Sequence, residues 1–182
     1  MRKLFYEFRL ILICLLGMGV ALSFNACSDD GDDGDPTPEL PKSPYFLYEV
    51  ELSDDLFDIS SPVAVFIDED GNPTSEPLTN TKWRKEYTGK KFPCVTQFSV
   101  IFTYDESKLT KSVYTLGHTM NVTSALVDTK NQFYKINNTQ NSSSGTVKKE
   151  NIERYLLSLN QSMQAMYTLD KEGNRDYVVP ED

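Results

Sequence analysis

Cysteine and histidine are scarce in this chain, which limits the sites it can form. The 182 residues include one histidine, His118, and three cysteines, at positions 14, 27 and 94. A closed zinc site normally takes four cysteine or histidine ligands, so we expect no metal site and no cofactor. Cys94 and His118 are the one such pair beyond residue 27, and the signatures of cysteine hydrolases are missing around them. We therefore expect no catalytic residues, and a small Cys94–His118 hydrolase is the weakest hypothesis.

Basic residues are too few for a protein that binds nucleic acid. The chain has 18 lysines and arginines against 27 aspartates and glutamates, for a formal net charge of -9. Residues 1–26 carry +2, which leaves -11 for residues 27–182. Nucleic-acid-binding proteins present a basic surface, and recognition of anionic lipid headgroups needs clustered lysines or arginines. We therefore expect no nucleic-acid partner.

An uncharged apolar run lies near the N-terminus. Arg2, Lys3 and Arg9 give a positive start, and residues 10–22 (LILICLLGMGVAL) follow. A membrane-spanning helix needs about 20 apolar residues, so this run is too short. A basic start, a short apolar segment and a small residue, Ala26, are typical of a secretory signal peptide. We expect residues 1–26 to be that signal peptide.

The residues Phe24-Asn25-Ala26-Cys27 resemble the lipobox of bacterial lipoprotein precursors, in the relaxed form familiar from Bacteroidota. Phenylalanine replaces the commoner leucine at its first position, and asparagine is unusual at the second. The resemblance implies cleavage before Cys27, acylation of Cys27 and a lipid anchor in the membrane. Cys94 would then be the one free cysteine of the mature chain, without a partner for an internal disulfide.

An acidic run, SDDGDDGD, follows this cysteine at positions 28–35. It resembles the export signal that sends such lipoproteins to the outer face of the outer membrane, which implies a protein facing the cell exterior. A block of like charges is also typical of a self-repelling tail. Four prolines at positions 36 to 44 favour an extended chain. Residues 27–44 form the expected linker, up to about 60 Å long.

Alternating apolar residues predict short strands in the expected domain, residues 45–182. In residues 45–52 (YFLYEVEL), Phe46, Tyr48, Val50 and Leu52 share one face, as in a half-buried strand. The pattern predicts a mainly β protein, an antiparallel β-sandwich of the immunoglobulin-like or transthyretin-like kind. Comparable strand patterns occur at residues 63–68, 81–87, 94–104, 112–122, 125–128, 132–136 and 163–169, and the strands at 125–128 and 132–136 predict a hairpin across residues 129–131.

The pattern changes after residue 136. Residues 137–145 (NNTQNSSSG) are of low complexity and predict a loop. Ile152, Tyr155, Leu156 and Leu159 then recur at helical spacing. We therefore expect one amphipathic helix over residues 147–159.

Residues 68–72 (DEDGN) look at first like the start of a calcium-binding loop. Such a loop needs glycine at its sixth position, whereas Gly71 is fourth. A tight turn explains the same residues. Residues 170–174 (DKEGN) repeat the pattern after a second predicted strand, and two hairpins of similar design are the simplest explanation.

The most distinctive aromatic residues lie in residues 82–92 (KWRKEYTGKKF), where basic residues separate them. Exposed aromatic residues and arginine often mark contact sites. We therefore expect a binding face formed by Trp83, Arg84, Tyr87 and Phe92. The alternative is an ordinary strand whose lysine stems cover apolar surface.

These observations favour a non-enzymatic outer-membrane surface lipoprotein that binds or assembles with an extracellular glycan or protein. One alternative is a carbohydrate-binding accessory of a glycan uptake system, for which a shallow aromatic cleft would be expected. The other is a fimbrial or structural subunit, for which a donor strand or an exposed sheet edge would be expected.

Overall fold

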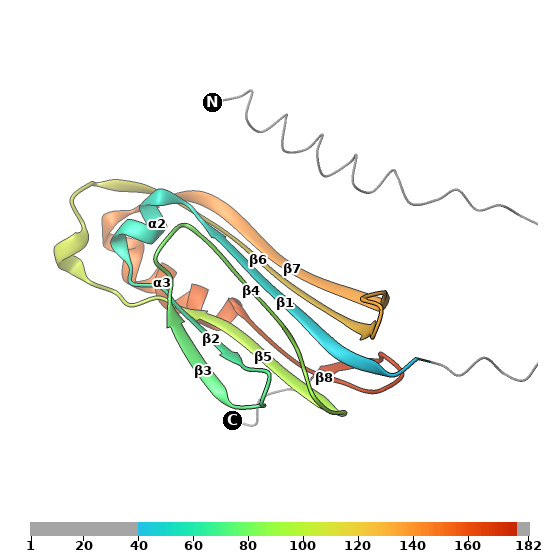
Figure 1. Ribbon diagram of the computed structural model, residues 1–182. Helices are drawn as coiled ribbons and strands as arrows, with labels where there is room; N and C mark the ends of the chain where they lie inside the picture. The colour runs from blue at the N-terminus through green and yellow to red at the C-terminus, as the bar shows by residue number, and fades with distance from the viewer. Residues whose placement is uncertain (1–39, 178–182) are drawn as a thin grey trace, which may run out of the picture. The chain divides into compact units, whose positions relative to one another are not determined.

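A computed structural model describes residues 40–177, which form two antiparallel sheets packed face to face (Figure 1). The first sheet has the strand order β4–β1–β6–β7, and the second has the order β3–β2–β5–β8–β9. The predicted antiparallel sandwich is therefore confirmed. The strands are β1 (Lys42–Leu52), β2 (Val63–Ile67), β3 (Pro73–Pro77), β4 (Lys82–Thr88), β5 (Cys94–Ile101), β6 (Val113–Asp128), β7 (Phe133–Lys148), β8 (Gln164–Leu169) and β9 (Arg175–Tyr177).

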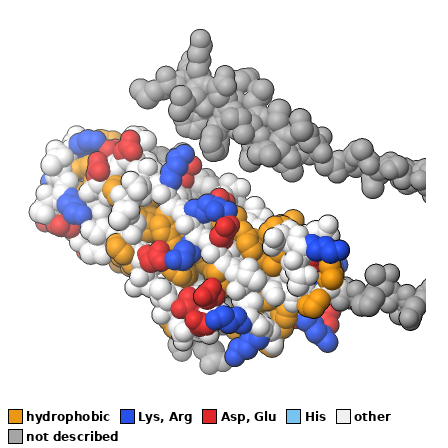
Figure 2. Space-filling view, in the orientation of Figure 1, with side chains coloured by type: hydrophobic (Ala, Val, Ile, Leu, Met, Phe, Trp, Pro, Cys, Tyr) orange, Lys and Arg blue, Asp and Glu red, His pale blue; other side chains and the backbone are white. Residues whose placement is uncertain are grey.

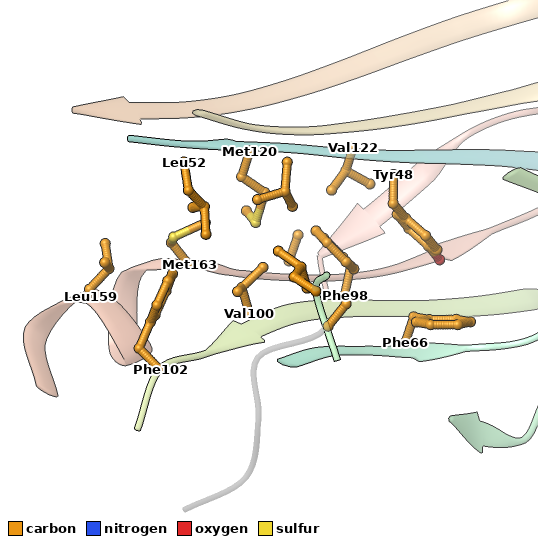
Figure 3. Close-up of a cluster of buried hydrophobic side chains, with 14 of the residues drawn as sticks. Tyr48, Leu52, Phe66, Phe98, Val100, Phe102, Met120, Val122, Leu159 and Met163 are labelled. Atoms are coloured by element: carbon orange, nitrogen blue, oxygen red, sulfur yellow. The ribbon is translucent and has the colours of Figure 1, made fainter. Parts of the chain in front are cut away.

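The core lies between the sheets, where inward-facing residues alternate with outward-facing ones along each strand. The apolar positions predicted for β1, from Phe46 to Leu52, are at most 4% exposed. The Tyr48 ring stacks on Phe98 of the facing sheet, with 4.7 Å between ring centroids. Figure 3 shows Met120 and Val122 of β6 in the same layer. Each such side chain contributes about 1.5–3 kcal/mol through burial, so burial of these residues favours the face-to-face packing of the sheets.

Two α-helices cover one end of the sandwich (Figure 1). The short helix α2 (Asp54–Ile59) buries Leu56 and Ile59, and Ser53 caps it by accepting the Leu56 N–H at 3.3 Å. With only six residues, α2 is too short to show helical periodicity, and it was not predicted. The second helix, α3 (Ile152–Ser162), buries Ile152, Leu156 and Leu159.

The predicted start of this second helix was wrong. Residues 147 and 148 still belong to β7, and a 3-10 turn over Lys149–Asn151 precedes α3. The apolar residues at helical spacing were identified correctly, whereas strand pairing fixed the boundary.

The predicted loop over residues 137–145 is also wrong, because these residues lie within β7. They pair in unbroken register with β6, from Val113 opposite Lys148 to Ser124 opposite Asn137. Asparagine, serine and glycine are poor strand formers, but pairing with the long apolar β6 overrides that preference. Similarly, β1 begins at Lys42, so residues 42–44 of the expected linker belong to a strand.

Three hairpin turns share one design, at residues 68–72, 128–132 and 170–174. In each turn, the backbone N–H of the first residue donates a hydrogen bond to the carbonyl of the fifth residue, at 3.0–3.1 Å. Each begins with aspartate, whose side chain accepts the N–H of the fifth residue. The repeat seen in the sequence is therefore a shared turn. The middle hairpin, across residues 129–131, was also predicted, but its likeness to the other two was not, because asparagine replaces glycine there. The fourth residues have φ angles of 85° (Gly71), 61° (Asn131) and 82° (Gly173).

Candidate functional site

The four residues expected to form a binding face do not share one surface. Trp83 points into the sandwich and stacks on Phe98, with ring centroids 5.7 Å apart and planes at 4°. Tyr87 is 9% exposed and lies within hydrogen-bonding distance of the Tyr48 hydroxyl, at 3.0 Å. Arg84 points to the opposite face. Because successive strand residues face opposite sides, residues 83 and 87 cannot share a face with residue 84.

Arg84 is engaged with acidic neighbours on the outer face. Its guanidinium lies 2.6 Å from Glu86 and 3.7 Å from Glu49 of the adjacent strand β1. Lys82 pairs with Glu51 in the same way, at 3.1 Å. Basic and acidic side chains accordingly lie beside one another on the face shown in Figure 2. This part of β4 presents paired charges rather than a basic patch.

Lys85 closes the side of the sandwich between two edge strands. Its ammonium lies 2.6 Å from the Glu76 carboxylate of β3 and 5.3 Å from the centre of the Phe66 ring. The bridge therefore joins β4 of one sheet to β3 of the other. Trp83, Lys85 and Tyr87 of β4 thus face and cover the core, whereas Lys82 and Arg84 pair with acidic residues outside it.

Phe92 lies apart from the other three, in the loop between β4 and β5. It is partly buried against the core, and it lines a hollow of about 610 Å³ at the end of the sandwich opposite the helices. Lys42, Tyr134, Lys135 and Lys171 line the same hollow. The Lys42 ammonium lies 4.9 Å from the Tyr134 ring centre, and Lys171 pairs with Glu172 at 3.6 Å.

Cys94 and His118 lie far apart, so they form no catalytic pair. Cys94 and Pro44 both lie against Gly89, whereas His118 is opposite Leu52. Pro44 and Leu52 are eight residues apart along β1, or about 27 Å at the usual strand rise. A nucleophile and its base need contact near 3 Å.

Burial also disfavours the charged form of both groups. It raises the pKa of the Cys94 thiol and lowers the pKa of His118 below its ordinary value of 6.5. His118 Nε2 lies 3.3 Å from the Asn141 side-chain oxygen of β7. Both residues are therefore mainly uncharged at neutral pH.

The acidic turns form hydrogen bonds with their own backbone. The N–H groups of Asn72 and Asp70 donate to Asp68 at 2.9 and 3.0 Å, and they lower the pKa of Asp68. The N–H of Gln132 is the main cause that lowers the pKa of Asp128, and the Asn174 side chain does so for Asp170. Among residues 40–177, no cluster of three or more histidine, cysteine or acidic side chains is arranged to hold a metal.

The feature that stands out is the edge formed by β7. Four strands of the described chain end a sheet, and three of them carry features that block pairing. Prolines stand at both ends of β3, charged residues cover β4, and β9 has only three residues. By contrast, β7 has 16 residues, with no charge or proline between Lys135 and Lys148.

We call residues 137–147 of β7 the open edge. One side of it pairs regularly with β6, and no other strand of residues 40–177 pairs with its other side. At the usual strand rise it extends about 35 Å. Next to it, Ile136 is 64% exposed. A row of unpaired backbone N–H and C=O groups is a template for another strand.

Apart from Val147, which packs on the core, the inner side chains of the open edge are small or polar, and those of Asn137 and Asn141 bond to neighbouring segments. The Asn141 side-chain amide donates to the Ser162 carbonyl at 2.8 Å, at the end of α3. These bonds position β7 without burying it in the core. The sequence carried only an indirect signal for this strand, which is the alternation over residues 113–124 of its neighbour β6.

The expected signal peptide, Cys27 and the acidic run lie outside the described residues. Between residues 40 and 177, none of the helices has the length and apolar character needed to cross a membrane. Comparison of the chain with models of known protein families, with curated proteins and with solved structures found no match.

Proposed function

We propose that this protein is a non-enzymatic assembly module, anchored by lipid on Cys27 to the outer membrane and facing the cell exterior. The basic start, the lipobox-like Phe24-Asn25-Ala26-Cys27 and the acidic run support the anchor and its location. The sandwich at residues 40–177 then serves as the extracellular part.

The open edge is the observation that carries the assembly role. Extended segments commonly bind proteins by adding a strand to an exposed sheet edge, with main-chain hydrogen bonds supplying affinity. The other three edges of the described sheets carry prolines, charges or very few residues, so pairing is directed to β7. This favours a fimbrial or other structural subunit over a glycan-binding accessory.

An accessory that binds acidic glycan is the second candidate, and it rests on the hollow beside Phe92. An aromatic ring and lysine ammonium groups are suited to a sugar that carries a carboxylate. Trp83 and Tyr87 do not contribute, because they face the core. Phe92→Ala should abolish retention on an acidic-glycan array if this candidate is right, whereas Arg84→Ala should not. Equal retention of both variants would remove it.

Anchoring is tested on the protein made in its own host. Mass spectrometry of the N-terminal peptide should find acylated Cys27, and protease added to intact cells should degrade the domain. An intact leader with an unmodified Cys27 would contradict the anchor, and full protection of the domain would contradict its exterior location.

The assembly role is tested by placing charge on the open edge. Ser142→Lys/Ser144→Lys puts two lysines on outward, exposed positions of β7, and charges on an edge strand block pairing. Wild-type protein extracted under mild conditions should migrate above the monomer on a native gel, and this variant should migrate as monomer. Val95→Lys/Gln97→Lys makes the same charge change on exposed positions of the central strand β5 and should leave the complex intact. A wild-type protein that is already monomeric would contradict the role.

A further inference from the structure

The chemistry of the open edge is compatible with a second copy of itself. Two identical strands related by a twofold axis run antiparallel, so each donor row meets an acceptor row. Residues 137–147 contain no charge and no proline. Nothing in this segment therefore opposes pairing with its own copy.

Charge on the rest of the protein would otherwise keep two copies apart, since residues 27–182 carry a net charge of -11. The neighbourhood of the open edge differs, because no aspartate or glutamate occurs from residue 129 to residue 149. Two open edges can therefore approach without bringing carboxylates together.

We propose that two copies of this protein pair through their open edges, so that the four-stranded sheets join into one sheet of eight strands, four from each copy. This inference rests on the proposed function, because the lipid anchor supplies part of the driving force. Pairing of two polar strands is marginal in solution. Two anchored copies share a surface and a common orientation, which raises their effective concentration without new contacts.

A cysteine scan in native membranes tests this pairing by its symmetry. Cys94→Ser removes the free thiol of the described domain. Single cysteines then replace outward, exposed residues of β7, one per variant: Asn138, Gln140, Ser142, Ser144 or Thr146. The position of the twofold axis decides which residues of the two β7 strands face each other. Like charges disfavour the register that places Lys135 opposite Lys148 of the second copy. Several other positions of the axis remain open, so a scan is needed.

The expected result is a disulfide-linked dimer that peaks at one scanned position, or more weakly at two neighbouring scanned positions when the axis lies at the residue between them. A residue two positions from the axis lies about 14 Å from its mate, beyond the reach of a disulfide. Dimer formation should therefore fall on both sides of the peak. Cys94→Ser alone and Cys94→Ser/Thr88→Cys on the charged edge β4 should give no dimer.

The outcomes separate this inference from the proposed function. Adducts formed only with another protein would overturn pairing with a second copy and keep the assembly role. Equal dimer formation at all five positions would indicate random collision and overturn the pairing. No adduct of any kind at the open edge would overturn both.

Discussion

The strands β4 and β7 form the two edges of the same sheet, yet they are held in different ways. In β4 the inward residues include Trp83 and Tyr87, which pack into the aromatic core. In β7 they include Asn137, Thr139 and Asn141, which form polar contacts at the surface. β4 is thus part of the core, whereas β7 is held mainly by its backbone pairing with β6.

Because of this difference, β4 contributes to the stability of the sandwich, whereas β7 remains available to bind a partner. Apolar burial stabilises β4 by several kcal/mol, and Lys85 ties it to the other sheet through Glu76. The backbone of β7 is satisfied on one side only. An edge outside the core can accept a partner without disturbing the packing between the sheets.

The largest effect is expected from removing the aromatic side chain that ties β4 to the core. Trp83→Ala should lower the free energy of unfolding by about 3 kcal/mol, the lower range for large core truncations, because Trp83 is only partly buried. Val147 is the matched β7 residue that packs on the core, and Val147→Ala should cost about 1 kcal/mol. Urea denaturation measures both values. Equal costs would show that the two edges contribute alike to the core.

The next effect concerns the turn that leads into β7. The Asp128 carboxylate accepts the N–H groups of Lys130 and Gln132 and the Tyr134 hydroxyl, all within 3 Å. Asp128→Ala leaves these donors unpaired, so it should lower the thermal midpoint by several degrees. Asp68→Ala, in the exposed β2–β3 turn, should lower it less. The reverse order would mean that β7 does not depend on its turn.

As the pH falls, the stabilising contribution of His118 beside β7 should be lost before those of the aspartates in the turns. Burial lowers the pKa of His118 in the folded protein. The contribution of neutral His118 to the free energy of unfolding is therefore complete above its ordinary pKa of about 6.5. This contribution is lost as the pH falls from there through the lower pKa of the folded state. The pKa values of Asp68, Asp128 and Asp170 are also lowered, so their contribution is lost only below about pH 4.

Urea midpoints measured between about pH 7 and pH 3 should therefore decline in two steps. His118→Gln should remove the first step and keep the second. A first step that persists in this variant would have to come from another group.

The smallest effect is expected from the bridge between β4 and β3. Lys85 and Glu76 have side chains 40% and 37% exposed, and such pairs are worth only about 0–1 kcal/mol because water and salt screen them. A double-mutant cycle with Lys85→Gln and Glu76→Gln should give a coupling in this range that shrinks at high salt. A larger, salt-insensitive coupling would mean that charge, rather than Trp83, seals this edge.

Several elements were predictable because they depend on local pattern. The alternation of Phe46, Tyr48 and Val50 predicted β1, and Ile152, Leu156 and Leu159 predicted α3 apart from its start. Applying the same alternation to residues 82–88 would have placed Trp83 and Tyr87 on the core side. That error came from weighing the composition of the segment above its strand period.

The open edge could not be predicted from local pattern, because residues 137–145 have low strand preference and no apolar alternation. Their strand form comes from pairing with β6, a contact between segments of the folded chain. The separation of Cys94 from His118 likewise follows from strand order.

The sequence by itself determined which side chains become the core and where the hairpins turn, since apolar periodicity and aspartate–glycine turns act over a few neighbouring residues. Only the tertiary structure decided which strands end the sheets and which of those edges stays unprotected. The reason is that an edge is defined by the absence of a neighbour, and neighbours are assigned only when distant segments of the chain pair.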